Sequence, residues 1–433
     1  MGRTRFVAAI TMVALALTVG ACAKSKTTTN EASCTSNPSL ALRLSGLKSN
    51  TVQMAGSIQA AKTVATTAKT TIKIGFFGDL TGSNAGLVVP GEHGAQLAIE
   101  QANAKGDLPV TVALAPKDNK EANPSTAPKL AQDLIADKSV VGVIGPAFSG
   151  ETSAVQPLFK AAGLTHITQS ATRDDLTGGN YTTFFRGLAS NADEAAAAAK
   201  IIKKLGCKKV AVVDDKSAYG QDLAGTANGL MTGAGATIVD RESIAPANDY
   251  TSLVDTLITK KPDVVVYGGY EPQASIIVKQ MREKGVTALF IGGDGIKDVK
   301  FGQDAGASGK GVIAVAPAKD PNAASDQASK TFVTNFKAKF GVAPDIYAPE
   351  GYDIANIFIA GIKDCGKSGA SGITRKCVLD FVTNLNGFQG LTKTFGWTTD
   401  PKALHEVTDK FMNVFQIKTD TFQLIGDITK VAP

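Results

Sequence analysis

Three short polar turns carry the residues best suited to hold a small charged molecule. They run from Gly145 to Ser149, from Thr168 to Thr172 and from Gly292 to Gly295, each after an apolar segment of strand length. The first two lead into predicted helices, where free backbone N–H groups and a Ser or Thr hydroxyl favour a carboxylate. The third contains Asp294, whose carboxylate suits an amine. On the residues alone, each turn is equally well a helix or turn cap.

Residue patterns typical of enzymes are missing from the sequence. The three histidines, His93, His166 and His405, stand in no recognisable nucleophile or metal pattern. Ser149 lacks both glycines of a Gly-x-Ser-x-Gly elbow. The stretch 309–311, Gly-Lys-Gly, lacks the upstream glycine and the following Ser or Thr of a phosphate loop. We therefore expect no catalysis, no metal and no cofactor.

Length and composition predict a globular protein with two lobes. The 433 residues exceed what one hydrophobic core usually organises. Hydrophobic residues make up 43% of the chain and aromatic residues 6%, and the formal net charge is only +6. Nucleic-acid binding would need a basic stripe with stacking aromatic residues. Because the positive charges are instead mixed with acids, we expect no nucleic-acid partner.

The N-terminal residues predict export and lipid attachment. A start with two arginines precedes an apolar run, residues 6–19, that is too short for a comfortable membrane span. Residues 19–22, Val-Gly-Ala-Cys, resemble a bacterial lipobox, so residues 1–21 are predicted to be a signal peptide and Cys22 to carry the lipid. The alternative is cleavage by the general signal peptidase, with Cys22 an ordinary cysteine. We expect an exported protein, lipid-anchored to the outer face of the cell membrane.

The segment that follows is predicted to be a flexible tether. Residues 22–70 are rich in Ser, Thr, Ala, Asn and Lys and can bury little apolar surface. Residues 40–54 are more apolar, and whether they pack on the folded body is left open.

Four further cysteines allow disulfides in an exported protein. Cys365 and Cys377 are close in sequence and flank a glycine-rich loop, which predicts a local bridge. Cys34 and Cys207 would be the remaining pair. However, Cys207 precedes a strand that looks buried, and it is equally well a packed thiol.

From Thr71 onward, apolar runs of strand length alternate with longer amphipathic stretches. The predicted strands are residues 72–77, 110–114, 140–144, 210–213, 264–267, 289–291 and 312–315. Asn123 and Pro124 suit the start of one of the helices between them. Residues 411–417 and 422–428 predict a hairpin. Repeated βαβ units predict an α/β fold with doubly wound parallel sheets covered by helices.

Several short stretches occur in an order typical of one family. They are Ile72–Gly75, Leu80–Gly82, Gly94–Ala98, Val143–Pro146, Val212–Asp215, Tyr219-Gly220, Asp263–Tyr270 and Gly351–Asp353. In this order and behind a lipobox, they resemble the periplasmic type I solute-binding proteins for branched-chain amino acids. The resemblance covers the chain from Thr71 to about Pro433. It is specific for the family and not for the ligand.

The resemblance implies two lobes joined by a three-strand hinge, with a ligand in the cleft between them. Lobe I would comprise residues 71–188 and 318–396, and lobe II residues 189–317 and 397–433. The hinge crossings are expected near residues 186–190, 315–318 and 396–399.

The family's residues for the ligand's charged groups have matches here. Ser149 and Thr172, with the backbone of Ser170 between them, match positions that hold the ligand's α-carboxylate. Asp294 matches the position that receives the α-ammonium, where the best-known members carry glutamate. The aspartate side chain is shorter than that of glutamate, which leaves room for the ammonium group to shift or for a water molecule. A zwitterion needs donors on one side and a carboxylate on the other, so only a closed form satisfies both ends.

Aromatic residues are expected to close over the ligand. Tyr219 and Tyr270 match such positions, and Tyr347 falls near another in the first lobe. Lobe packing is the alternative role for Tyr219 and Tyr270. Leu87 stands where some relatives place an aromatic residue.

By resemblance, the sequence is predicted to be the extracytoplasmic substrate-binding protein of an ABC importer. It would capture a small amino acid, branched-chain or related, and deliver it as a monomer to permease and ATPase subunits. The alternative is a sensor or binder of an amide, urea or aromatic acid with the same fold. Asp294 opposite two hydroxyls favours a charged amine.

Overall fold

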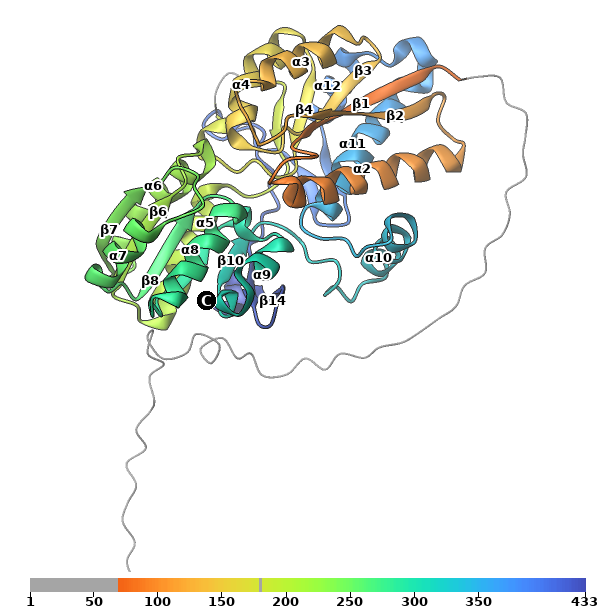
Figure 1. Cartoon of the computed structure of the whole chain (residues 1–433). Coiled ribbons are helices and arrows are strands. Elements are labelled where there is room, and N and C mark those ends of the chain that lie inside the picture. The colour runs from red at the N-terminus through yellow and green to blue at the C-terminus, as the bar shows by residue number, and fades with distance from the viewer. Residues whose placement is uncertain (1–68, 179–180) are drawn as a thin grey trace, which may run out of the picture. The chain divides into compact units, whose positions relative to one another are not determined.

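The computed structural model describes residues 69–178 and 181–433, and Figure 1 shows their helices and strands arranged around two main β-sheets. Within these residues the first sheet has five strands and the second has seven. The predicted α/β class with parallel-sheet lobes is confirmed. The signal peptide, Cys22, Cys34 and the tether up to residue 68 lie outside the described residues. Lipid attachment therefore stays a prediction, and the pairing of Cys34 with Cys207 stays an open alternative.

The first sheet is parallel throughout and has the order β2-β1-β3-β4-β5. Its strands are β1 (Thr71–Gly78), β2 (Thr111–Asp118), β3 (Val140–Ile144), β4 (Thr165–Thr168) and β5 (Phe184–Arg186). Every residue of β3 is buried, as expected for an apolar strand with helices on both faces. The helices of this lobe are α2 (Ala85–Lys105), α3 (Ala127–Ala136), α4 (Ser149–Ala161), α10 (Gln327–Phe340), α11 (Ala348–Cys365) and α12 (Arg375–Thr383).

Helices α2 and α11 lie side by side in the first lobe (Figure 1), and glycines allow their close approach. A Cβ at Gly94 would lie 2.0 Å from the carbonyl oxygen of Ala348. A Cβ at Gly351 would lie 2.1 Å from the carbonyl oxygen of Gly91. Both contacts are to backbone, so neither position has room for a side chain. The start of α11 is thereby held against α2.

Replacing Gly94 with alanine is expected to lower the free energy of unfolding by about 1–3 kcal/mol, because the two helices must move apart. Gly229 in α6 (Ala218–Gly233) is the matched control, since nothing lies within 4 Å of a Cβ built there. Gly229→Ala should stabilise the protein by about 0.5–1 kcal/mol. Urea unfolding measures both variants. Equal stabilities for the two would contradict the close packing of α2 on α11.

The second sheet contains parallel strands and ends in an antiparallel pair, in the order β14-β13-β10-β9-β8-β6-β7. Its strands are β6 (Lys209–Asp214), β7 (Thr237–Ser243), β8 (Val264–Gly268), β9 (Leu289–Gly292), β10 (Ile313–Ala316), β13 (Asn413–Ile417) and β14 (Phe422–Asp427). The predicted C-terminal hairpin is confirmed in β13 and β14. The helices of this lobe are α5 (Asn191–Leu205), α6, α7 (Thr251–Lys260), α8 (Glu271–Glu283), α9 (Lys300–Ala305) and α13 (Ile428–Val431).

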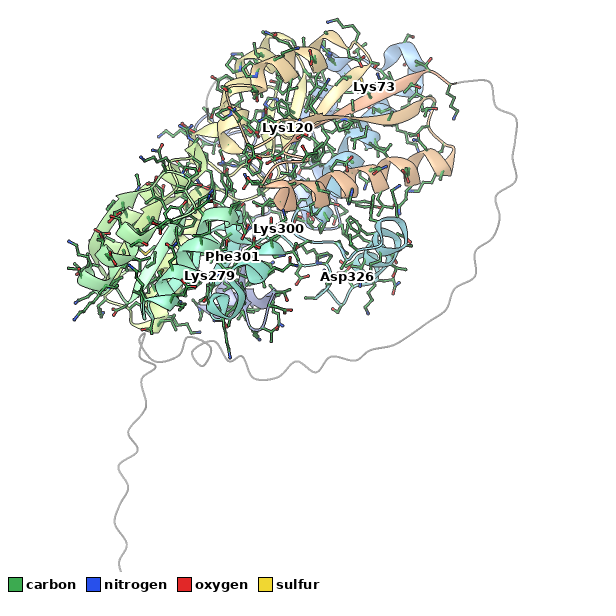
Figure 2. The ribbon with its side chains drawn as sticks, in the orientation of Figure 1. Lys73, Lys120, Lys279, Lys300, Phe301 and Asp326 are labelled. Carbon is green, nitrogen blue, oxygen red and sulfur yellow. A yellow bond between two sulfur atoms is a disulfide. The ribbon has the colours of Figure 1, made fainter. Side chains whose placement is uncertain are left out.

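Helix α9 anchors the C-terminal hairpin to the second lobe. Phe301 is fully buried beside the exposed Lys300 (Figure 2). Its ring packs edge-on against Phe422 of β14, with the ring centroids 5.5 Å apart. The chain returns from the first lobe to form this hairpin, so the contact fixes the end of the chain in the second lobe.

Three segments connect the two sheets. The first runs from β5 into α5 and the second leaves β10 toward α10. The third differs from the predicted segment at 396–399, because the loop after β12 folds back along β5. The backbone of Arg186 in β5 is hydrogen-bonded to His405 and Val407. Residues 397–407 therefore contact the first lobe, and we propose that the third crossing lies between Val407 and Asn413.

Smaller elements complete both lobes. They are the hairpin strands β11 (Asn386–Gln389) and β12 (Thr394–Gly396) and the 3₁₀ turns η1 (Asp174–Leu176), η2 (Asp294–Ile296), η3 (Gly306–Gly309), η4 (Gly366–Ser368) and η5 (Ala370–Gly372). Cys365 at the end of α11 and Cys377 in α12 form a disulfide, the pairing expected from the sequence.

The start predicted for one helix at Asn123 and Pro124 is wrong, since α3 begins at Ala127. The Oδ1 atom of Asn123 accepts a hydrogen bond from the backbone N–H of Ser125 at 2.9 Å. This bond makes a local turn before the helix rather than a helix cap.

Candidate functional site

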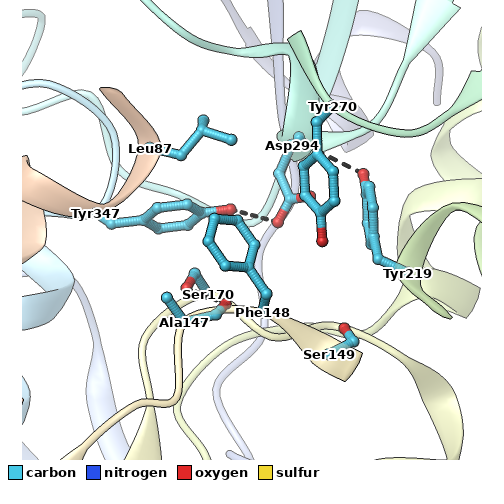
Figure 3. Close-up of a pocket in the computed structure, with 10 residues that line it drawn as sticks. Leu87, Ala147, Phe148, Ser149, Ser170, Tyr219, Tyr270, Asp294 and Tyr347 are labelled. Atoms are coloured by element: carbon cyan, nitrogen blue, oxygen red, sulfur yellow. Dashed lines mark hydrogen bonds between the residues drawn. The ribbon is translucent and has the colours of Figure 1, made fainter. Parts of the chain in front are cut away.

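A small pocket lies between the two lobes (Figure 3). The first lobe contributes Leu87, Ala147, Phe148, Ser149, Ser170 and Tyr347 to its lining, and the second contributes Tyr219, Tyr270, Asp294 and Gly295. Most of these residues follow the carboxyl ends of strands, which is where open parallel sheets bind ligands. The three polar turns of the sequence therefore converge on one pocket.

Six of the seven residues predicted to bind a ligand line this pocket. They are Ser149, Ser170, Tyr219, Tyr270, Asp294 and Tyr347. Thr172 does not line it. The Thr172 side chain is fully buried, and its Oγ1 has no hydrogen-bond partner. The turn after β4 reaches the pocket through Ser170 instead.

The first lobe presents a helix end and two hydroxyls to the pocket. Helix α4 begins at Ser149, so the unpaired N–H groups of its first turn favour negative charge there. Ser149 Oγ accepts a hydrogen bond from the backbone N–H of Arg173 at 3.2 Å and keeps its own proton to donate. Ser170 Oγ donates its proton to the carbonyl of Ala147 at 2.6 Å, so the hydroxyl donor that remains on this side is that of Ser149. This side of the pocket suits a carboxylate.

Asp294 supplies negative charge from the second lobe. It begins the turn η2 directly after β9 and is only 3% exposed. Its Oδ2 accepts a hydrogen bond from the Tyr347 hydroxyl of the first lobe, drawn dashed in Figure 3. Burial raises the pKa of Asp294, and the hydrogen bond from Tyr347 opposes the rise. The bond to Tyr347 also ties the two lobes together across the pocket.

Aromatic rings form the rest of the wall. Tyr219 and Tyr270 stack with their centroids 5.2 Å apart. Phe148 of the first lobe meets Tyr270 edge-on at 5.0 Å. Asp215, at the end of β6, accepts a hydrogen bond from the backbone N–H of Tyr270 at 3.1 Å and one from Ser217 at 2.9 Å. It thus holds together the two loops that carry the stacked tyrosines.

Arg186 supports the turn behind the pocket. It is fully buried at the end of β5, and its Nη1 donates to the carbonyls of Thr172 at 3.1 Å and Arg173 at 2.5 Å. Its Nη2 donates to Thr177 and to the carboxylate of Glu406. The conformation of the turn therefore depends on a buried ion pair with the segment that precedes the third crossing.

Two residues at the site were not found from the sequence. Phe148 lay inside a predicted polar turn, and its position between Ala147 and Ser149 gave no sign of a wall residue. Glu194 is fully buried behind Asp294. In the sequence it is indistinguishable from any acidic residue in the first turn of a helix. Its contact with Asp294 became visible only in the fold.

Residues 69–178 and 181–433 contain neither a metal-binding cluster nor a membrane-spanning helix. No three His, Cys, Asp or Glu side chains in these ranges gather so that they could hold a metal ion. None of the helices described there is long and apolar enough to cross a membrane.

Comparisons with known proteins agree with this fold. The family model for periplasmic binding proteins matches residues 71–421. The Leu/Ile/Val-binding protein BraC3 of Rhizobium johnstonii is 28% identical over 69% of this chain and 80% of its own length. The LivJ substrate-binding protein of Streptococcus pneumoniae, solved with isoleucine, is 26% identical and has a TM-score of 0.73, over 82% of this chain and 98% of its own.

A third relative binds a different kind of molecule. A solute-binding protein of an R. palustris ABC transporter, solved in complex with benzoate, is 21% identical. Its TM-score is 0.72, and the match covers 84% of this chain and 97% of that one. The resemblance noted in the sequence is confirmed: the chain belongs to the periplasmic binding protein family.

Proposed function

We propose that this protein captures a small amino acid, branched-chain or related, between its lobes and delivers it to the permease of an ABC importer. One observation carries the proposal: the helix end and hydroxyls of the first lobe lie across the pocket from Asp294 of the second. A carboxylate and an amine on one small molecule match these two sides. The relatives named for leucine, isoleucine and valine binding support the same ligand class.

Binding and lobe closure are coupled in this proposal. Ser149 and Ser170 stand on one lobe and Asp294 on the other, so a zwitterion is fully bonded only when the lobes are closed. A ligand shifts a conformational equilibrium by its difference in affinity for the two states. The closed, loaded form would then be the one that the permease recognises.

The remaining parts of the proposal concern the setting of this binding site. The protein would be exported and held on the outer face of the cell membrane by lipid on Cys22. It would act as a monomer with separate permease and ATPase subunits. It would bind and deliver without catalysis, in keeping with relatives that are named as binding proteins.

An aromatic acid is the second candidate ligand, followed by an amide or urea. The observation that favours it is the aromatic wall of Phe148, Tyr219, Tyr270 and Tyr347. The Tyr347 hydroxyl already occupies one oxygen of Asp294, which a ligand without an amine would leave undisturbed. The benzoate-bound protein shows that this fold accommodates such a ligand.

A thermal-shift screen of the purified protein separates these ligands. The panel contains L-leucine, L-isoleucine, L-valine, acetamide, urea and benzoate. A ligand at about 100 times its Kd stabilises a protein by about 2.7 kcal/mol, which is a readable shift in Tm. We expect aliphatic amino acids to raise the Tm. If benzoate or an amide raises it and no amino acid does, the amino-acid function is wrong and the second candidate replaces it.

A further inference from the structure

Glu194 lies directly behind Asp294, although it is not part of the pocket lining. It is in the first turn of α5, is fully buried, and has its carboxyl group within hydrogen-bonding reach of the Asp294 carboxyl. The backbone N–H of Asp294 points at Glu194 Oε1 at 3.4 Å. A Cβ at Gly293 would lie 2.2 Å from Glu194 Oε2, so the chain passes directly over this carboxyl. The backbone therefore holds the two acids together.

No cation balances this pair of acids. Within residues 69–178 and 181–433, neither Glu194 nor Asp294 forms an ion pair with Lys, Arg or His. The lysine that follows in sequence, Lys297, is paired with Asp345. Two buried carboxyl groups in contact oppose each other's ionisation, and burial raises the pKa of both.

The donors around the pair decide which carboxyl keeps a proton. Asp294 Oδ2 accepts a hydrogen bond from the Tyr347 hydroxyl, while the backbone N–H of Gly295 donates to the Tyr219 hydroxyl at 3.2 Å. Glu194 accepts only long contacts of 3.4 Å from the Tyr219 hydroxyl and the Asp294 N–H. Because donors stabilise the ionised form, the negative charge falls on Asp294. Burial raises the pKa of Glu194 well above its usual range, and the charge of Asp294 raises it further.

We propose that Glu194 is a positioning residue that keeps a proton and donates it in a hydrogen bond to Asp294, so that the ligand's amine meets one oriented negative charge. The inference rests on the proposed amino-acid function and explains how the cation-binding side stays ionised in a buried site. Glu194 itself does not touch the ligand. Its role is exerted through Asp294.

The other titratable groups that face the pair are phenols. Three tyrosines lie around the two acids: Tyr219 of α6, Tyr347 before α11 and Tyr270 before α8. Burial raises the pKa of each tyrosine hydroxyl well above its usual value. All three therefore stay neutral near neutral pH. The acids that act on these phenols from other elements are Glu350, Asp215 and Glu151. The Glu194–Asp294 pair is thus the group beside the ligand's amine whose charge changes with pH.

Calorimetric titration of the full chain with L-leucine, from about pH 5 to about pH 8.5, tests this role. In the wild type, affinity should fall as the pH is lowered through the raised pKa of Asp294. Glu194→Ala removes a donor to Asp294, so the midpoint of this fall should move up by about one pH unit, with about a tenfold loss of affinity below it. Glu194→Gln keeps an N–H donor and should restore the wild-type midpoint.

Glu271→Gln is the matched control for these variants. Glu271 is a buried acid of the same lobe that does not line the pocket, and its replacement should leave the midpoint in place. Equal weakening by Glu194→Ala and Glu194→Gln at every pH would overturn the proposal, because Glu194 would then act as a second negative charge. The proposal would also be overturned if Glu194→Ala lost stability but kept the wild-type midpoint for the fall in leucine affinity. Glu194 would then contribute only to packing.

A measurement without ligand separates this inference from the proposed function. A carboxyl group that keeps its proton only in the folded state makes the protein less stable as the pH rises above about 4.3, the ordinary value for glutamate. The Tm of the wild type should therefore drop relative to Glu194→Gln between about pH 5 and about pH 8. A constant difference would overturn the inference even if leucine binds. A widening difference with no amino acid bound would overturn only the proposed function.

Discussion

Asparagine in place of Asp294 is expected to weaken the binding of L-leucine by at least about 100-fold near neutral pH. Truncating one partner of a buried, hydrogen-bonded charge pair costs about 2–5 kcal/mol, and each 1.4 kcal/mol is about tenfold in affinity. Asp294 is the one acid in the lining of the pocket, and no other lining residue can carry a negative charge near neutral pH. Calorimetric titration of wild type and Asp294→Asn measures the loss.

Asp298→Asn is the matched control for this prediction. Asp298 follows Asp294 in the same loop and is equally buried, at 2% exposed against 3%, but it does not line the pocket. The same chemical change at Asp298 should alter leucine affinity by less than about threefold. If Asp294→Asn binds leucine as well as Asp298→Asn does, the charge of Asp294 plays no part in ligand binding. An aromatic acid or amide would then become the better candidate.

Methionine in place of Arg186 is expected to lower the free energy of unfolding by about 3–5 kcal/mol. Removing one partner of a buried ion pair leaves the other charge uncompensated. Arg186 is fully buried, and its side chain also donates to the carbonyls of Thr172 and Arg173 behind the pocket. Its loss would leave the largely buried carboxylate of Glu406 with Lys410 as its remaining ion-pair partner. Urea unfolding at neutral pH measures the effect.

Two further variants show whether the loss in the free energy of unfolding comes from breaking the Arg186–Glu406 ion pair. Arg186→Met combined with Glu406→Leu should recover much of the loss, because an apolar pair of similar volume is often as stable as a buried ion pair. Lys376→Ala breaks an exposed pair with Asp380 and should cost no more than about 0.5 kcal/mol. Equal stabilities for Arg186→Met and Lys376→Ala would show that the buried pair does not support the hinge.

The fold was largely predictable because its signals are local. Most strands of the two sheets are short apolar runs such as Val140–Ile144 that lead into a helix, whereas the three-residue β5 and the half-exposed β7 were not predicted. The C-terminal hairpin likewise followed from two apolar runs with a polar turn between them. Because parallel strands place their carboxyl ends at one edge, the polar turns that follow them could be expected to meet.

The features that sequence reasoning missed depend on contacts between distant residues. The later third crossing that we propose rests on the return of the loop after β12 to Arg186 of β5, a contact that no local pattern near residues 396–399 indicates. Glu194 and Asp294 are 100 residues apart, and nothing near either one indicates the other. Thr172 was expected at the pocket from the resemblance, but its side chain is buried away from the lining, and of this turn only Ser170, which was also expected, reaches the pocket.

The central claim is that one molecule carries both the carboxylate and the amine that the two lobes hold. Calorimetric titration with L-leucine, isocaproate and isoamylamine tests it most directly, because the last two are leucine without its amine and without its carboxylate. We expect leucine to bind and each of the other two to bind at least about 100-fold more weakly. If isocaproate binds as tightly as leucine, the amine is not recognised and the assignment of Asp294 to the ligand's ammonium is wrong.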